Sequence, residues 1–196
     1  AVLCGTMMAA SLSLTACGGA STAESVDLRE VPLDTILEKA KAEGQINSVG
    51  MPDDWANWRG SWAAVSEKYG LTHEDTDMSS AEELSTFETE KDAATKDIGD
   101  VGQAFGPTAV EMDVVQPYKA STWDSIPDWA KDPDGKWCIS YVGTMSAMVN
   151  ADRVSTTIDS WQALKDSGAT ITIGDVVRGA SAQMAVLSCA YALSSY

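Results

Sequence analysis

The sequence is poor in histidine and in basic residues, and it contains no long apolar run. Its one histidine, His73, cannot supply a zinc-finger spacing or a His-Glu-x-x-His helix. Its 13 basic residues are outnumbered by 29 acidic ones, giving a net charge of −16, and a chain this acidic repels phosphate backbones. No run of 18 apolar residues occurs. We therefore expect neither nucleic-acid binding nor a membrane-spanning helix.

Familiar catalytic motifs are also missing. There is no Gly-x-Ser-x-Gly elbow, no Walker A loop and no Gly-x-Gly-x-x-Gly turn. A Ser-His-Asp set would have to use His73, which stands in a polar stretch and is predicted to lie on the surface. Acidic residues are plentiful, so a two-carboxylate hydrolase stays open, but their spacing indicates no catalytic pair. We expect a protein that is not an enzyme and that carries no cofactor and no resident metal.

The N-terminal segment has the pattern of a processing signal. Residues 1–16 are uncharged and apolar, and they run into Leu14-Thr15-Ala16-Cys17. An apolar core that ends in small residues is typical of a secretory signal peptide, here incomplete over residues 1–17. The last four residues resemble a bacterial lipobox, which implies a lipid on Cys17. Residues 18–27 are small and polar and are predicted to form a flexible tether. The expected location is extracytoplasmic, at the periplasmic or outer face of the cell membrane.

Two further cysteines, Cys138 and Cys189, stand in apolar runs. One alternative is that they form a disulfide in an oxidising compartment. The apolar setting instead favours two buried free thiols.

The body of the chain alternates helix and strand signals. Helices are predicted over 33–43, from a cap at Asp53–Asp54 to Gly70, from a capping box at Ser80–Glu83, over 108–114, after a cap at Asp159, and over 180–193. Strands are predicted over 46–51, 71–77, 98–102 and 170–173, with a long extended segment over 137–150. Trp55, Trp58 and Trp62 share one helical face, and Trp62 is predicted to be core. The repeated β-α order predicts an α/β fold with a parallel sheet.

In such a sheet, ligands bind beyond the carboxyl ends of the strands. Three segments of this chain come at such ends, each leading to a predicted helix: 51–58, 77–80 and 104–108.

The order of several short motifs resembles the extracellular solute-binding proteins of bacterial ABC transporters, which have the periplasmic-binding-protein type II fold. The similarity is closest to the iron(III)- and polyamine-type branch. It rests on Glu43–Asn47, Gly50–Trp55, Asp97–Pro107, Trp137–Asn150 and Thr172–Asp175. It implies a two-lobe fold with lobe 1 over 28–140, largely complete, an inter-lobe crossover over 141–150, and the start of lobe 2 over 151–196. Members of that family are longer, so we expect this chain to be truncated.

The resemblance implies a substrate-binding lipoprotein of an ABC importer, which closes by a hinge around a small solute and delivers it to a membrane permease. We expect a monomer. A secreted α/β enzyme on the same fold and a surface receptor without a transport role are the alternatives.

Three kinds of ligand stay open. Carboxylates beside tryptophans suit an organic cation such as a polyamine. Helix N-termini with Ser79, Ser80, Thr108 and Arg178 suit an anion. A ferric ion would need a tyrosine pair, and Tyr141 and Tyr191 are isolated in the sequence. The candidate ligand-binding residues are Asp53, Asp54, Trp55, Trp58, Ser79, Ser80, Phe105, Gly106, Thr144, Asp175, Arg178, Ser181 and Gln183.

Overall fold

A computed structural model describes residues 31–194 of the chain. The predicted signal peptide over 1–17, its Cys17 and the tether over 18–27 lie outside these described residues.

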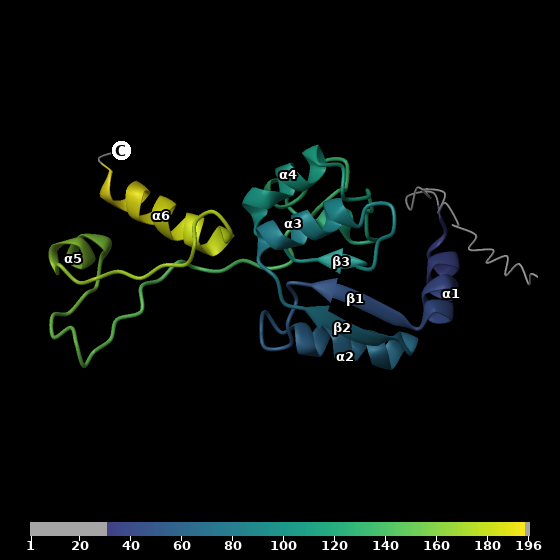
Figure 1. The fold of residues 1–196 in the computed structure, drawn as a ribbon, viewed down its shortest axis with the longest axis horizontal. Coiled ribbons are helices and arrows are strands. Elements are labelled where there is room, and N and C mark those ends of the chain that lie inside the picture. Colours follow the sequence, from purple (N-terminus) through teal and green to yellow (C-terminus); the bar gives the residue numbers. More distant parts are fainter. Residues whose placement is uncertain (1–30, 195–196) are drawn as a thin grey trace, which may run out of the picture.

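A small parallel sheet organises the first part of the structure (Figure 1). Its strands are β1 (Gln45–Val49), β2 (Thr72–Thr76) and β3 (Ile98–Gly99), in the order β2-β1-β3. Gln45 lies opposite Thr72, and Ser48 lies opposite Ile98. Both pairings are parallel, so the three carboxyl ends meet at one edge. The predicted α/β class with a parallel sheet is confirmed.

Helices connect and flank these strands. In Figure 1, α2 runs along β2, whereas α3 and α4 lie on the side of β3. The helices are α1 (Leu33–Glu43), α2 (Trp58–Tyr69), α3 (Ser80–Thr89), α4 (Gly106–Glu111), α5 (Trp161–Asp166) and α6 (Ala180–Leu193), with 3-10 turns η1 (Gln103–Phe105), η2 (Trp123–Ser125) and η3 (Asp128–Ala130).

Two helices end where glycine predicts that they end. Gly44 after α1 and Gly70 after α2 have φ values of 77° and 74°, in the left-handed region that glycine enters without a steric penalty. Each donates its N–H back to a carbonyl of the last turn. The predicted helices over 33–43 and 180–193 match α1 and α6 at both ends.

The core lies around the sheet. Its buried members include Val49 and Met51 at the end of β1, Trp62 on α2 and Leu84 on α3. The prediction that Trp62 is a core residue is confirmed. The residues 33–138 that surround this core are called the sheet unit below.

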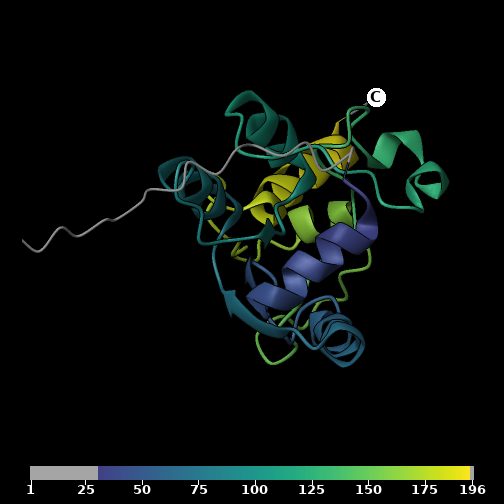
Figure 2. The ribbon, with the colours of Figure 1, turned by 90° about the vertical axis from the view of Figure 1, so that its right-hand side faces the viewer.

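After the sheet unit, the chain runs through a long segment without helix or strand and then forms the helical pair, α5 and α6 (Figures 1 and 2). The start of α6 touches the sheet unit. Arg178 pairs with Glu82, and the Ala81 N–H donates to the Arg178 carbonyl over 3.4 Å. No helix among residues 31–194 has the length and apolarity needed to cross a membrane.

Three predicted helix starts are wrong by one to four residues. Asp53 and Asp54 do not cap α2, because two successive turns intervene, closed by Trp55 N to Pro52 O and by Trp58 N to Trp55 O. The capping box is Ser79 with Glu82, one residue before the predicted pair, because Ser79 is the last extended residue. The α5 cap is Ser160 instead of Asp159.

Two further elements differ. Helix α4 begins at Gly106 and ends at Glu111, because Pro107 occupies the first turn, where its missing N–H is harmless. The predicted strand over 170–173 does not form. Its isoleucines Ile171 and Ile173 are exposed, and no strand among the described residues lies beside them to supply hydrogen bonds.

The predictions for cysteine burial and for His73 are corrected as well. Cys138 is exposed and Cys189 is half-buried, and both are free thiols. His73 is half-buried, because its ring stacks on the Trp62 indole with centroids 3.9 Å apart.

Candidate functional site

Aromatic and acidic side chains meet at the carboxyl edge of the sheet. We call Trp55, Trp58, Asp100 and Tyr141, with Glu83 beneath them, the edge cluster. Trp55 and Trp58 follow β1, Asp100 follows β3, Glu83 comes from α3, and Tyr141 comes from the segment that leaves the sheet unit. Four separate parts of the chain therefore converge here.

A chain of hydrogen bonds joins three members of the edge cluster. The indole Nε1 of Trp55 donates to the Tyr141 hydroxyl over 2.6 Å. That hydroxyl donates in turn to Asp100 Oδ2 over 2.7 Å. Burial raises the pKa of Tyr141 to about 12, so the phenol stays neutral and keeps its proton for this bond. Burial also raises the pKa of Asp100. Trp55 itself is half-exposed, so the cluster is open to solvent on one side.

A stack of rings supports the cluster from α2. Trp58 stacks on Trp62 with centroids 6.1 Å apart, and its ring meets Tyr141 edge-on at 6.2 Å and 77°. Trp62 stacks in turn on His73. The Trp58 Nε1 is buried and has no hydrogen-bond partner. It nevertheless lies close enough to Asp100 to lower the pKa of that carboxyl, against the larger effect of burial.

A buried polar network lies beside this stack. Ser48 is fully buried, and its hydroxyl lies 2.8 Å from His73 Nε2 and 2.5 Å from Asp75 Oδ1. The Met51 N–H donates to the same Asp75 oxygen over 3.0 Å. Because Ser48 gives its only proton to Asp75, His73 Nε2 carries a proton and donates to Ser48. A nucleophilic serine needs the opposite arrangement, with the acid orienting the histidine and the hydroxyl exposed. The network therefore orders the strand end.

Glu83 is the most unusual member of the edge cluster. Its side chain is 1% exposed, and its Oε2 is buried without a hydrogen-bond partner. Burial, with Asp100 close by, raises its pKa from 4.5 to about 8. The carboxyl fits only because glycine backbone faces it. A Cβ built at Gly50 would overlap Oε1, and one built at Gly99 would come within 2.7 Å of Oε2.

A second group of predicted residues meets at the start of α3. Glu82 Oε2 accepts from the Ser79 N–H over 2.9 Å and from the Ser79 hydroxyl over 2.6 Å, while Oε1 pairs with Arg178. These Ser79 hydrogen bonds, helped by Arg178, lower the pKa of Glu82. The Ser80 hydroxyl accepts from the Gly102 N–H over 3.1 Å. The helix N-terminus and the arginine that were predicted to hold an anion are thus occupied by a carboxylate of the chain itself.

The remaining predicted residues do not join either group through side-chain contacts. Asp53 is exposed and pairs with Arg59 over 3.5 Å. Asp54, Thr144 and Ser181 are exposed. Phe105 is the last residue of η1, and Gly106 lies against the Trp137 ring. Asp175 accepts from Val177 N over 2.8 Å, and Gln183 Nε2 donates to Val176 O over 2.9 Å.

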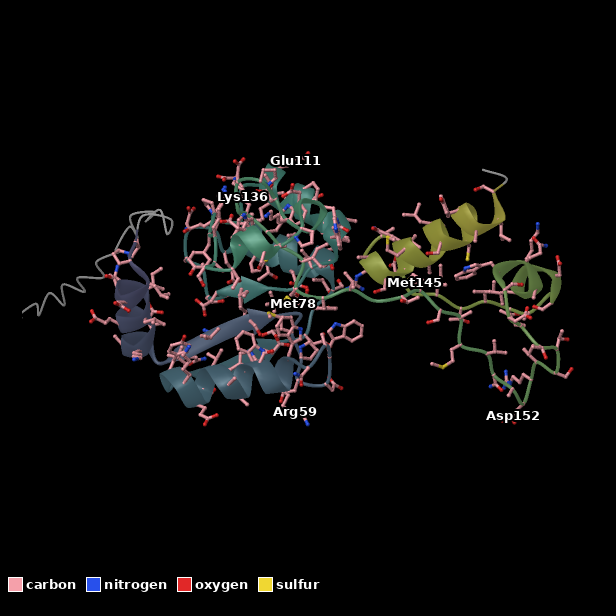
Figure 3. All side chains as sticks on the ribbon, turned by 180° about the vertical axis from the view of Figure 1, so that it is seen from behind. Arg59, Met78, Glu111, Lys136, Met145 and Asp152 are labelled. Carbon is pink, nitrogen blue, oxygen red and sulfur yellow. The ribbon has the colours of Figure 1, made fainter. Side chains whose placement is uncertain are left out.

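A shallow hollow of about 300 Å³ lies along α3, lined by Asp77, Met78, Glu82, Ser85 and Thr86. Met78 is labelled in Figure 3, where the side chains of the sheet unit are seen from behind. The hollow shares Glu82 with the group at the start of α3, and its Asp77 acts on the charge of Glu83, but no member of the edge cluster lines it.

Sequence reasoning missed Asp100, Glu83 and Tyr141 as candidate site residues. Asp100 was placed inside the predicted strand over 98–102, whereas the structure ends β3 at Gly99, so that its carboxylate stands at the sheet edge. Glu83 was assigned to a capping box that the structure moves by one residue. Tyr141 had no local signal, since its importance depends on where the long segment passes.

Comparison with known proteins connects this region to a family. Residues 94–167 match the family model described as a bacterial extracellular solute-binding protein. The matched segment contains Asp100 and Tyr141. It supports a binding-protein role outside the cytoplasm, as the sequence predicts. No curated protein matches the chain.

A solved structure is also similar. It is FutA (IdiA) of Trichodesmium, in complex with iron and citrate ligands. The two chains are 19% identical, and the superposition has a TM-score of 0.42. It covers 48% of this chain and 30% of the other, so the matched part spans less than a third of the FutA chain.

Proposed function

We propose that this protein is a non-catalytic solute-binding component of an ABC importer and that it binds a small organic cation at the edge cluster. Binding would draw two lobes together by hinge motion, and the closed form would be the one that a membrane permease recognises. In this proposal, the sheet unit is lobe 1 and the helical pair begins lobe 2. A lipid on Cys17 would hold the protein at the outer face of the membrane.

The observation that carries the cation proposal is the hydrogen-bonded set of Trp55, Tyr141 and Asp100. Indole and phenol faces attract an ammonium group by about 0.5–2 kcal/mol each. Asp100 supplies a carboxylate next to these rings, and its Tyr141 partner is neutral. Asp75 and Asp77 lie close enough to act on the Glu83 carboxyl beneath Asp100, so the local field at this edge favours a positive ligand.

An anionic ligand is less well supported. Glu82 already accepts from Ser79 and pairs with Arg178, so an incoming anion would have to displace a carboxylate that is covalently part of the site. For a ferric ion, no group of three His, Cys, Asp or Glu side chains in residues 31–194 is placed to hold a metal, and Tyr141 is the one tyrosine of the edge cluster, where its hydroxyl donates to Asp100.

Isothermal titration calorimetry on the full-length protein tests the ligand class. Putrescine and spermidine are compared with glycerol 3-phosphate and ferric citrate. We expect heat of binding from the diamine or triamine only. Asp100→Asn should abolish it, whereas Asp92→Asn, which removes an exposed carboxylate elsewhere in the sheet unit, should not. Binding of the phosphate ester or ferric citrate alone contradicts the cation proposal.

The anchor is tested separately in a bacterial host. A protein with a lipid on Cys17 should incorporate labelled palmitate and fractionate with membranes, and Cys17→Ser should do neither. Equal labelling of the two proteins contradicts the anchor but leaves the ligand proposal intact.

A further inference from the structure

Glu83 takes no part in the side-chain hydrogen bonds that hold the edge cluster together, and its one polar link to the cluster is to the Asp100 backbone, which lowers its pKa against the larger effect of burial. The Trp55–Tyr141–Asp100 chain does not include it, and the capping box of α3 uses Glu82. A carboxyl that is 1% exposed and has an unpartnered oxygen is costly to keep in a fold. Such a group commonly serves a function that the empty protein does not display.

The surroundings of Glu83 favour its neutral form. The carboxyl lies against the backbone of Gly50 and Gly99, with no water-facing side. The titratable groups acting on it are Asp75 on β2, Asp77 after β2 and Asp100 after β3, and all three are acids. The fourth, Tyr141, faces it from the long segment as a neutral phenol. Four elements therefore present acids or a phenol to Glu83, and the positive charge that would stabilise its anion is absent from this set.

We propose that Glu83 is a proton-linked carboxyl of the cation site: it is neutral while the site is empty, and it releases its proton to solvent when an ammonium ligand binds beside Asp100. This inference rests on the proposed function. The balance is simple, because a protonated carboxyl and a cation become a carboxylate, a bound cation and one free proton. The ammonium group of the ligand would supply the positive charge that stabilises the Glu83 carboxylate and that the groups facing it do not provide.

The physical consequence is a binding affinity that rises with pH. Burial holds the pKa of Glu83 at about 8 in the empty protein, so the proton must leave at neutral pH before the carboxylate can form. If the ligand favours the ionised form, linkage makes its affinity rise by up to about tenfold per pH unit below that pKa. Capture would then be stronger in neutral than in acidic surroundings.

Calorimetry with putrescine on the full-length protein tests this linkage. Between about pH 5.5 and about pH 7.5 both amines stay charged, since alkylamines have pKa values of about 10. The titration is repeated in phosphate and in MOPS, which differ in ionisation enthalpy, and neither of which has a net positive charge. We expect release of about one proton per bound putrescine and an affinity that rises by up to about 100-fold across this range.

Two variants separate Glu83 from its neighbours. Glu83→Gln should bind putrescine without releasing a proton and with an affinity that is flat with pH. Glu88→Gln removes an exposed carboxylate from the same helix and should behave as the natural protein does. A direct check needs neither a variant nor a ligand. In the free protein, one glutamate carboxyl should titrate with a midpoint near 8 by ¹³C NMR.

The outcomes are distinguishable. Putrescine binding with no proton release, or a flat pH profile in the natural protein, overturns the role of Glu83 and leaves the cation site standing. A glutamate that titrates at the ordinary value overturns it as well. Absence of putrescine binding at every pH overturns both this inference and the cation proposal.

Discussion

The hydroxyl of Tyr141 donates a 2.7 Å hydrogen bond to Asp100, 41 residues earlier in the chain. This bond connects the segment that leaves the sheet unit to the loop after β3. The same hydroxyl accepts from Trp55, so it ties that segment to the loop after β1 as well. A single phenol thus fixes the start of the long segment over the edge of the sheet, where the proposed ligand would bind.

Replacing Tyr141 with phenylalanine should weaken the proposed site without removing its ring. Hydrogen bonds to charged groups contribute about 1.5–3 kcal/mol, so we expect putrescine affinity to fall by about tenfold or more. Calorimetry measures the change. Tyr118→Phe is the matched control, because both tyrosines are 41% exposed and Tyr118 lies outside the edge cluster. An equal loss in both variants, or none in Tyr141→Phe, contradicts the assigned role.

Glu83 should make the stability of the protein depend on pH. Its pKa is about 8 in the folded protein against an ordinary 4.5, so the folded state holds the proton more tightly than the unfolded state. Its contribution to the free energy of unfolding is therefore full below about pH 4.5, falls as pH rises to about 8, and is constant above that.

A glutamine at position 83 cannot ionise, so the free energy of unfolding of Glu83→Gln should lack this dependence on pH. Relative to the natural protein, the variant should gain on the order of 3 kcal/mol in the free energy of unfolding between about pH 4.5 and about pH 7. Urea denaturation at a series of pH values measures the difference. Parallel curves for the two proteins would contradict the raised pKa.

A methyl group at Gly99 should crowd the buried carboxyl. Its Cβ would lie 2.7 Å from Glu83 Oε2 and 2.8 Å from Phe87 Cζ, and overpacking of this kind costs about 1–3 kcal/mol. Gly143→Ala is the control, since nothing lies within 4 Å of its Cβ. Neither glycine has a positive φ, so the comparison isolates crowding. Thermal denaturation should show a lower midpoint for Gly99→Ala only.

Arg178 should hold the start of α6 against α3. Its guanidinium pairs with Glu82, and its carbonyl accepts from Ala81 N. We expect Arg178→Ala to increase hydrogen exchange over residues 176–183, with little change in the sheet. High salt should raise exchange in the natural protein in the same region, because exposed ion pairs are screened. Arg153→Ala, in the preceding exposed segment, is the control. Unchanged exchange in Arg178→Ala would show that other contacts hold α6.

The sequence predicted correctly the helix ends that are set by a single neighbouring residue. Gly44 and Gly70 end helices because only a residue without a Cβ enters the left-handed region freely. Apolar spacing predicted α1, the apolar run over 180–193 predicted α6, and the β-α alternation predicted a parallel sheet. The same rules failed by one residue at α3 and at α5, where adjacent residues compete for the cap. There, the backbone path decides which of the two residues is the last extended one: Ser79 before α3 and Ser160 before α5.

The sequence by itself determined the α/β class, the acidic charge and the segments that end at the sheet edge, because these follow from residue type and periodicity over short distances. The tertiary structure alone decided that Asp100, Tyr141 and Glu83 form one cluster, and that Glu82 occupies the predicted anion position. It also decided that residues 170–173 are not a strand. These outcomes depend on contacts between residues far apart in the chain: a buried carboxyl is defined by what covers it, and a strand by the neighbour that pairs with it.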